Sequence, residues 1–194
     1  MKINEIFYSV QGEGRNTGRA AVFVRFSKCN LRCAFCDTEF SQFTEMTEEE
    51  IASEVKAIGG SSSLVVLTGG EPTLQLTESL CSKLHAIGKE ISIETNGTNE
   101  VPQGVDYVTC SPKFEYNDKA ALRVKHIDEL KVVYDGNNDM SLYDGITARY
   151  RYLQPCDTGD EERNREIISA TVEYVKAHPE WTVSIQTQKV LNIR

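Results

Sequence analysis

Three cysteines in one short segment are the residues of this sequence best suited to chemistry. Cys29, Cys33 and Cys36 follow one another with the spacing C-x3-C-x2-C, directly after an apolar run. Iron-sulfur clusters are held by Cys thiolates at short, regular intervals. A cubane cluster usually has four protein ligands, yet the next cysteine is Cys81, far along the chain. The spacing therefore favours a cluster with one iron left open to a small chelating ligand.

Two other interpretations of the same cysteines stay open. They could form a structural zinc site that lacks a ligand, or one disulfide with a spare thiol. Zinc sites normally join two separated Cys-x2-Cys pairs or add histidine, and no histidine lies in this region. The residue types therefore favour a cluster over zinc.

The three-cysteine motif resembles that of the radical S-adenosylmethionine (SAM) enzymes. The resemblance implies a 4Fe-4S cluster whose open iron chelates the amino and carboxylate groups of SAM. It also implies that an electron from the cluster splits the sulfonium and releases a 5'-deoxyadenosyl radical. In such enzymes the cofactor supplies the difficult chemistry and the protein supplies binding and orientation.

The composition limits the size and the partners of the protein. With 194 residues, 40% of them hydrophobic, and no proline-rich or charged linker, we expect one radical SAM domain over residues 1–194. The formal net charge is -8. Because non-specific nucleic-acid binding needs a cationic surface, we expect no nucleic-acid partner.

The N-terminus and the cysteine content point to a cellular compartment. Lys2, Asn4 and Glu5 come too early for a signal peptide, and no apolar run approaches the about 18 residues of a membrane span. Six cysteines in a reducing compartment suit ligands and buried thiols better than disulfides. We therefore predict a cytoplasmic protein with no membrane contact.

Short apolar runs alternate with amphipathic segments along the chain, which is typical of a parallel sheet with right-handed crossovers. The chain is shorter than the about 250 residues of a full eightfold barrel. The predicted fold class is α/β, an incomplete, modified TIM-like barrel of about six parallel strands with few helices, as in small radical SAM enzymes. We expect strands near residues 3–8, 19–26, 64–68, 91–94, 107–110, 130–134, 150–154 and 181–185, and helices near 47–58, 77–87 and 162–177.

Polar residues follow the ends of several predicted strands. The carboxyl ends of parallel strands meet at one edge, where α/β proteins bind their ligands. We therefore expect these segments to form one rim that faces the cysteine loop. They are Thr68-Gly69-Gly70-Glu71, Glu94-Thr95-Asn96, Ser111-Pro112-Lys113 and Gln154-Pro155-Cys156-Asp157.

Over nearly its full length, the sequence resembles the 7-carboxy-7-deazaguanine synthases, a family of radical SAM enzymes. The most discriminating motif is Gln11-Gly12-Glu13-Gly14, ahead of the cysteine loop. The resemblance implies 6-carboxy-5,6,7,8-tetrahydropterin as substrate, radical ring contraction with loss of ammonia, and a need for magnesium. The other matching segments are Cys36-Asp37-Thr38, Thr68-Gly69-Gly70-Glu71-Pro72, Glu94-Thr95-Asn96-Gly97-Thr98, Ser111-Pro112-Lys113 and Gln154-Pro155.

The resemblance also implies roles for single residues, carried over position by position. Cys29, Cys33 and Cys36 are expected to hold the 4Fe-4S cluster, and Thr38 is expected to bind magnesium through its hydroxyl. No side chain is expected to act as a catalytic acid or base. The residues expected to hold SAM are Phe35, Cys36, Asp37, Gly70, Glu94, Ser111, Pro112, Lys113, Gln154, Pro155, Cys156 and Asp157. Those expected to hold the pterin are Val10, Gln11, Gly12, Arg25, Thr68 and Arg194.

The chemistry of two of these residues suits their expected roles. Arg25 offers a forked donor to the substrate carboxylate or ring carbonyl, and the amide of Gln11 can pair with the mixed donor and acceptor edge of a pterin. The tail departs from the family's pattern at Gln188, where a histidine is expected. We expect Cys81 to be a core residue, and Cys110 and Cys156 to be small residues packed near the SAM site.

Two rival functions remain at this point. A glycyl-radical enzyme activase shares the cysteine spacing, but it acts on a protein backbone and needs neither Gln11 nor Thr38. A non-catalytic zinc or iron-sulfur module would use the loop only structurally. For the enzyme, the expected partners are the pterin and an electron donor such as flavodoxin or ferredoxin, and the resemblance suggests a homodimer.

Overall fold

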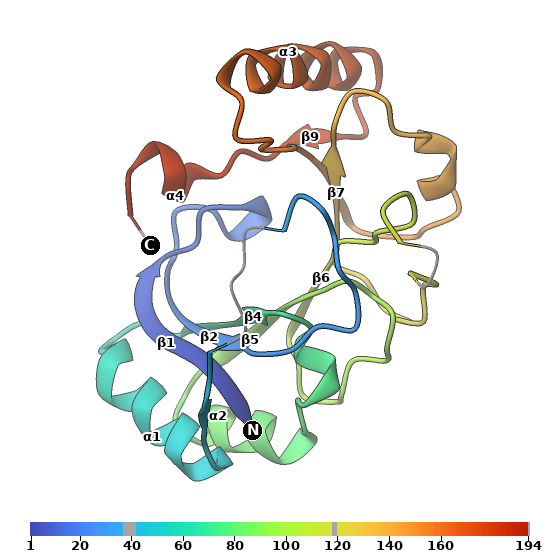
Figure 1. Cartoon of the computed structure of the whole chain (residues 1–194). Coiled ribbons are helices and arrows are strands. Elements are labelled where there is room, and N and C mark those ends of the chain that lie inside the picture. Colours follow the sequence, from blue (N-terminus) through green and yellow to red (C-terminus); the bar gives the residue numbers. More distant parts are fainter. Residues whose placement is uncertain (37–41, 118–119, 194) are drawn as a thin grey trace.

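A nine-stranded sheet is the framework of the computed structural model, which describes residues 1–36, 42–117 and 120–193. The strands lie in the order β3-β1-β2-β4-β5-β6-β7-β8-β9, and Figure 1 shows them curving around the centre of the molecule. Their bounds are β1 Lys2–Val10, β2 Ala20–Phe26, β3 Thr44–Glu45, β4 Leu64–Gly69, β5 Glu90–Thr95, β6 Tyr107–Cys110, β7 Glu129–Tyr134, β8 Tyr150–Pro155 and β9 Thr182–Val183.

The sheet is parallel from β2 onward and antiparallel at one edge. From β2 through β4 to β9, each strand is parallel to its neighbour in the sheet. Strand β1 pairs antiparallel with β2 and with β3. The carboxyl ends of the parallel strands therefore lie at one rim. The predicted α/β class, an incomplete barrel with few helices, is confirmed.

The longer helices cover the outside of the sheet: α1 Glu48–Gly59, α2 Glu78–Ala86 and α3 Glu161–Ala177. The short α4 Thr187–Val190 lies instead against the turn after β1, where Thr187 N donates to Gly12 O. Figure 1 shows α1 and α2 side by side at one end of the sheet and α3 beside β9. A capping box starts α1: Thr47 Oγ1 accepts a hydrogen bond from Glu50 N, and Glu50 Oε2 accepts one from Thr47 N.

The strands bury different side chains on their two faces. On β2, Val22, Val24 and Phe26 belong to the main core with the helices, as the two-residue repeat of a strand requires. The opposite face carries Phe23, whose ring stacks on Phe7 of β1 with centroids 5.0 Å apart. This inner face forms the floor beneath the rim.

Several elements differ from the predictions. The predicted strands and the three longer helices are present, but β3 and α4 carried no signal in the sequence because both are very short. Within α3, Ile168 is 47% exposed, and the helix is buried mainly through Ile167 and Thr171. Cys81 is fully buried, as expected. Within the described residues, none of the helices has the length and apolar character that a membrane crossing requires.

Candidate active site

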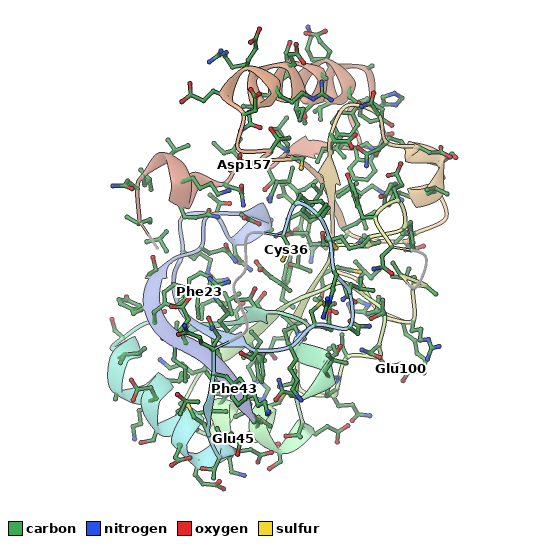
Figure 2. The ribbon with its side chains drawn as sticks, viewed as in Figure 1. Phe23, Cys36, Phe43, Glu45, Glu100 and Asp157 are labelled. Atoms are coloured by element: carbon green, nitrogen blue, oxygen red, sulfur yellow. The ribbon has the colours of Figure 1, made fainter. Side chains whose placement is uncertain are left out.

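A cavity of about 1370 Å³ opens at the rim where the parallel strands end. In Figure 2, Cys36 marks the cysteine loop and Phe23 the floor strand, and Asp157 lies at the end of β8. All three residues line this cavity, so segments from distant parts of the sequence meet there. The predicted site residues that line it are Val10, Gln11, Gly12, Arg25, Cys29, Cys33, Phe35, Cys36, Thr68, Gly70, Glu94, Ser111, Lys113, Gln154, Pro155, Cys156 and Asp157.

Four predicted site residues are not among the lining residues. Pro112 is buried next to the lining residues Ser111 and Lys113. Asp37, Thr38 and Arg194 lie outside the described residues. Their predicted roles in binding SAM, magnesium and pterin therefore stay predictions.

The glycine pair after β4 supports the start of the cysteine loop. Gly70 N donates to Phe26 O at 2.9 Å, and Glu71 N donates to Lys28 O at 2.8 Å. A Cβ atom on Gly70 would collide with the carbonyl oxygen of Lys28. In the structure, glycine is needed for the close approach of two backbones that fixes the loop.

The end of β5 also supports this loop. The buried carboxylate of Glu71 accepts hydrogen bonds from Asn96 N and Thr95 Oγ1, each at 2.7 Å. Asn96 Nδ2 in turn donates to Asn30 Oδ1 at 3.1 Å and lies 3.9 Å from Cys29 Sγ. The buried carboxylate thus holds the amide that contacts the first cysteine.

The three thiols fit an iron-sulfur cluster. Cys29, Cys33 and Cys36 are not joined in disulfides, and all three line the same cavity. In the described part of the chain, no three His, Cys, Asp or Glu side chains gather as the ligands of a single metal ion. A cubane cluster binds each thiolate through a different iron, so its ligands stand further apart than those of one ion.

The electrostatics near the thiols depend on burial and on one lysine. Burial raises the pKa of both Cys29 and Cys33, while the charge of Lys113 partly offsets this at Cys33. Lys113 Nζ donates to the backbone and hydroxyl oxygens of Ser111. Burial lowers the pKa of Lys113 itself. Because the ligands must be thiolates, cluster assembly is expected to release protons.

The β8 end contributes a tightly held carboxylate. Asp157 Oδ2 accepts from Lys189 Nζ at 2.6 Å, and Oδ1 accepts from Gly159 N and Asn164 Nδ2. The hydrogen bond from Lys189 is the main cause that holds the pKa of Asp157 at about 2. Much of this carboxylate's hydrogen-bonding capacity is therefore used within the protein.

Gln11 and Thr68, both predicted to hold the pterin, contact the same carboxylate. Gln11 Nε2 donates to Glu94 Oε1 at 3.0 Å, and Thr68 Oγ1 donates to Glu94 Oε2 at 2.8 Å. The sequence assigned Glu94 to SAM, whereas its contacts here join it to the predicted pterin residues.

Arg25, on strand β2, lies on the same side of the cavity as these pterin residues. Its Nε donates to Glu5 Oε1 at 2.9 Å, and its guanidinium lies 5.6 Å from the centre of the Phe7 ring. Within the described residues, only Nε of the Arg25 guanidinium makes a hydrogen bond, so the two terminal nitrogens keep donors for an anion.

Lys131 and Glu13 also belong to the site, although no role was predicted for either side chain. Lys131 Nζ lies 2.6 Å from Glu13 Oε2 and 3.7 Å from Glu94 Oε1. Burial by itself raises the pKa of Glu13, but the charge and hydrogen bonds that it receives hold that pKa at about 2. One signal was available, since Glu129 and Lys131 are two residues apart in an otherwise apolar strand, which places both on its inner face.

The C-terminal segment closes against the turn that contains Gln11. Thr187 N donates to Gly12 O at 3.1 Å, and the Nε2 atoms of Gln186 and Gln188 both donate to Glu13 Oε1 at 3.0 Å. A Cβ atom on Gly12 would collide with the side chain of Gln188. Glycine is therefore required where the tail meets this turn.

Comparisons with known proteins agree with this geometry. Residues 23–109 match the model of the radical SAM superfamily. The chain is 47% identical to a 7-carboxy-7-deazaguanine synthase of Bacteroides thetaiotaomicron, covering 100% of this chain and 98% of the relative. It is 38% identical to the enzyme of that name from Caulobacter vibrioides, covering 98% of each. The crystal structure of QueE from Escherichia coli is similar with a TM-score of 0.77 and 26% identity, covering 96% of this chain and 93% of that one.

Proposed function

We propose that this chain, which belongs to the 7-carboxy-7-deazaguanine synthase family of radical SAM enzymes, contracts the ring of 6-carboxy-5,6,7,8-tetrahydropterin to 7-carboxy-7-deazaguanine and releases ammonia. The observation that carries the proposal is the cavity that the thiols of Cys29, Cys33 and Cys36 share with the Gln11 turn. A cluster loop alone would fit many reactions, whereas this turn matches the family's most discriminating motif.

Cys29, Cys33 and Cys36 would hold the 4Fe-4S cluster on their thiolates. The bound cluster and SAM would supply a 5'-deoxyadenosyl radical that abstracts hydrogen from carbon 6 of the pterin. The loop residues serve this chemistry by position, because Gly70 and Asn96 fix the backbone and the first thiol. The contribution of the protein is therefore orientation and exclusion of water.

SAM would lie between the cysteine loop and the ends of β6 and β8. Lys113 is positioned by Ser111 near Cys33, where its charge suits the carboxylate of SAM. Phe35 packs edge-on against Tyr116 with ring centroids 4.6 Å apart, so an aromatic surface adjoins this region. The remaining proposed contacts come from Asp37, Gly70, Glu94, Pro112 and the segment Gln154-Pro155-Cys156-Asp157.

The pterin would lie between the Gln11 turn and Arg25. Gln11 Oε1 accepts from Glu13 N, and its Nε2 donates to Glu94, so one N–H and one lone pair of the amide remain for a ligand. This donor and acceptor pair complements the edge of a pterin. The terminal nitrogens of Arg25 suit the 6-carboxylate, and Thr68, Val10 and Gly12 complete the proposed contacts.

Several further features of the proposal rest on the resemblance. They are a magnesium ion bound through Thr38, contact of Arg194 with the substrate, a flavodoxin or ferredoxin as electron donor, and a homodimer. A single domain over residues 1–194 and a cytoplasmic location rest instead on the composition, the N-terminal residues and the cysteine content. Magnesium prefers oxygen ligands and keeps several waters, which suits a hydroxyl together with a substrate carboxylate.

The decisive experiment is an anaerobic reaction of the reconstituted protein with reductant, SAM, magnesium and 6-carboxytetrahydropterin. Mass spectrometry should detect the deazaguanine acid, and Cys33→Ala should form none. Cys81→Ala is the matched control, because Cys81 is buried in α2 away from the cavity. Iron-dependent SAM cleavage without loss of pterin would favour an activase, and zinc without iron would favour a structural module.

A further inference from the structure

Lys131 lies among carboxylates on the inner face of the sheet. Its side chain is only 8% exposed, and its ammonium contacts Glu13 and Glu94 from opposite elements, the turn after β1 and the strand β5. Glu129, two residues earlier on β7, is buried and also lies within its electrostatic reach. A buried cation with these neighbours is held in place, because moving it would leave carboxylates unpaired.

The two carboxylate residues that Lys131 contacts are also the two that orient Gln11. The backbone N–H of Glu13 donates to Gln11 Oε1 at 3.0 Å, and Glu94 Oε1 accepts from Gln11 Nε2 at 3.0 Å. A backbone N–H can only donate and a carboxylate can only accept. These contacts therefore distinguish the two ends of the amide, and a flipped amide would face a donor with a donor and a carboxylate with an oxygen.

Lys131 controls the spacing between these contacts. It draws Glu13 Oε2 to 2.6 Å, which fixes the turn that carries Glu13 N, and its charge stabilises Glu94 Oε1, the oxygen that also accepts from Gln11. Without the ammonium, Glu13 would keep the donors Gln186 and Gln188, while the donors left to Glu94 within the described ranges would be Gln11 and Thr68. Repulsion between the two carboxylates would then favour their separation.

We propose that Lys131 is a positioning residue that sets the specificity of the site by locking the Gln11 amide in one orientation. The locked amide offers one N–H and one oxygen in a fixed order, so it discriminates between heterocycles whose edges carry donors and acceptors in different orders. The inference rests on the proposed function, since it takes the pterin as the ligand that Gln11 contacts. It assigns Lys131 no contact with substrate.

The experiment compares two ligands on three variants. The cluster-loaded proteins are studied anaerobically without reductant, so that no turnover occurs, and calorimetry measures the Kd of 6-carboxytetrahydropterin and of its 2-oxo analogue. The 2-oxo analogue replaces the amino donor by an acceptor. The variants are Lys131→Met, Lys131→Gln and Lys89→Met. Lys89 is the matched control, because it is also buried but bonds to Ser62 O outside the cavity.

In Lys131→Met, the ratio of the Kd of the 2-oxo analogue to the Kd of the pterin should fall at least about tenfold. The reason is that a freed amide can turn to match either order of donor and acceptor on the ligand. Lys131→Gln should lose less, since it keeps an N–H donor. Lys89→Met should keep the wild-type preference. With reductant present, Lys131→Met should also release more 5'-deoxyadenosine per molecule of product, because a misplaced substrate meets the radical less often.

Cluster absorbance and thermal melting are measured first. If Lys131→Met fails to fold, the polar but uncharged Lys131→Gln decides, and a preference equal to that of the wild type would overturn the inference. Equal weakening of both ligands would do the same, since it indicates a structural role alone. Failure of the wild-type protein to bind or convert the pterin would instead refute the proposed function, which keeps the two failures distinguishable.

Discussion

Asn96 Nδ2 lies 3.9 Å from Cys29 Sγ, so the end of β5 contacts the first cysteine of the loop. Leu31 N adds a second N–H group 3.4 Å from the same sulfur. Donors of this kind favour a thiolate over a thiol and orient it. The arrangement makes Asn96 part of the support of the loop, although its side chain is not expected to bind metal.

We expect Asn96→Asp to weaken cluster retention. The new carboxylate cannot donate to the sulfur or to Asn30, and its charge repels the thiolate. The loss in cluster affinity should be about 10-fold to 100-fold, measured as iron per chain during titration with a chelator. Asn99→Asp is the control, because Asn99 bonds to Thr73 instead. Equal iron retention in the two variants would contradict a role for Asn96.

Thr38→Ala should retain the absorbance of the cluster and lose stimulation by magnesium. Thr38 lies two residues after Cys36, the third cysteine of the loop, but outside the described residues. This prediction therefore rests on the sequence and the resemblance. The hydroxyl is an oxygen ligand that alanine lacks. Product formation is measured across a magnesium titration, and unchanged stimulation would refute the role of Thr38.

Glu13 should make the stability of the protein depend on pH in the acid range. Its pKa falls from an ordinary 4.5 to about 2 on folding, because interactions led by the charge of Lys131 outweigh the effect of burial. Above pH 4.5 the carboxylate contributes its full stabilisation, and this is lost as the pH falls toward 2. The contribution is on the order of 3 kcal/mol.

The measurement is the free energy of unfolding in urea for wild type and Glu13→Gln from pH 7 to pH 2. The difference between them should be largest above pH 4.5 and shrink toward pH 2. Because other carboxylates titrate in both proteins, only the difference reports on residue 13. A difference that stays constant over this range would show that residue 13 does not titrate as proposed.

Gly12→Ala should weaken pterin binding more than SAM binding. The new Cβ would displace the Gln188 side chain, which bonds to Glu13, and would press on the backbone of the same residue. We expect pterin affinity to fall by about tenfold and stability by about 1–3 kcal/mol. Calorimetry with each ligand and thermal melting test this. Gly145→Ala is the control, since a Cβ there meets nothing within 4 Å.

The sequence predicted much of the fold because its signals are local. The capping box at Thr47 and the apolar stripe of α1 fix a helix within a few residues. The apolar run of β4 followed by two glycines marks the end of a buried strand. The exposure of Ile168 could not be predicted, because the spacing of apolar residues does not show how much of α3 the sheet covers.

By itself, the sequence determined the cysteine spacing, the succession of strands along the chain and the rim on which polar residues meet, since each follows from neighbouring residues and from the two-residue repeat of strands. Only the tertiary structure decided which of these residues contact one another. Lys131 and Glu13 are separated by 118 residues, and Gln188 and Glu13 by 175. The two-residue repeat of a strand shows on which face of the sheet a side chain lies, but it does not show which residue that side chain contacts across the cavity. That partner depends on how the curved sheet and the tail bring distant segments together.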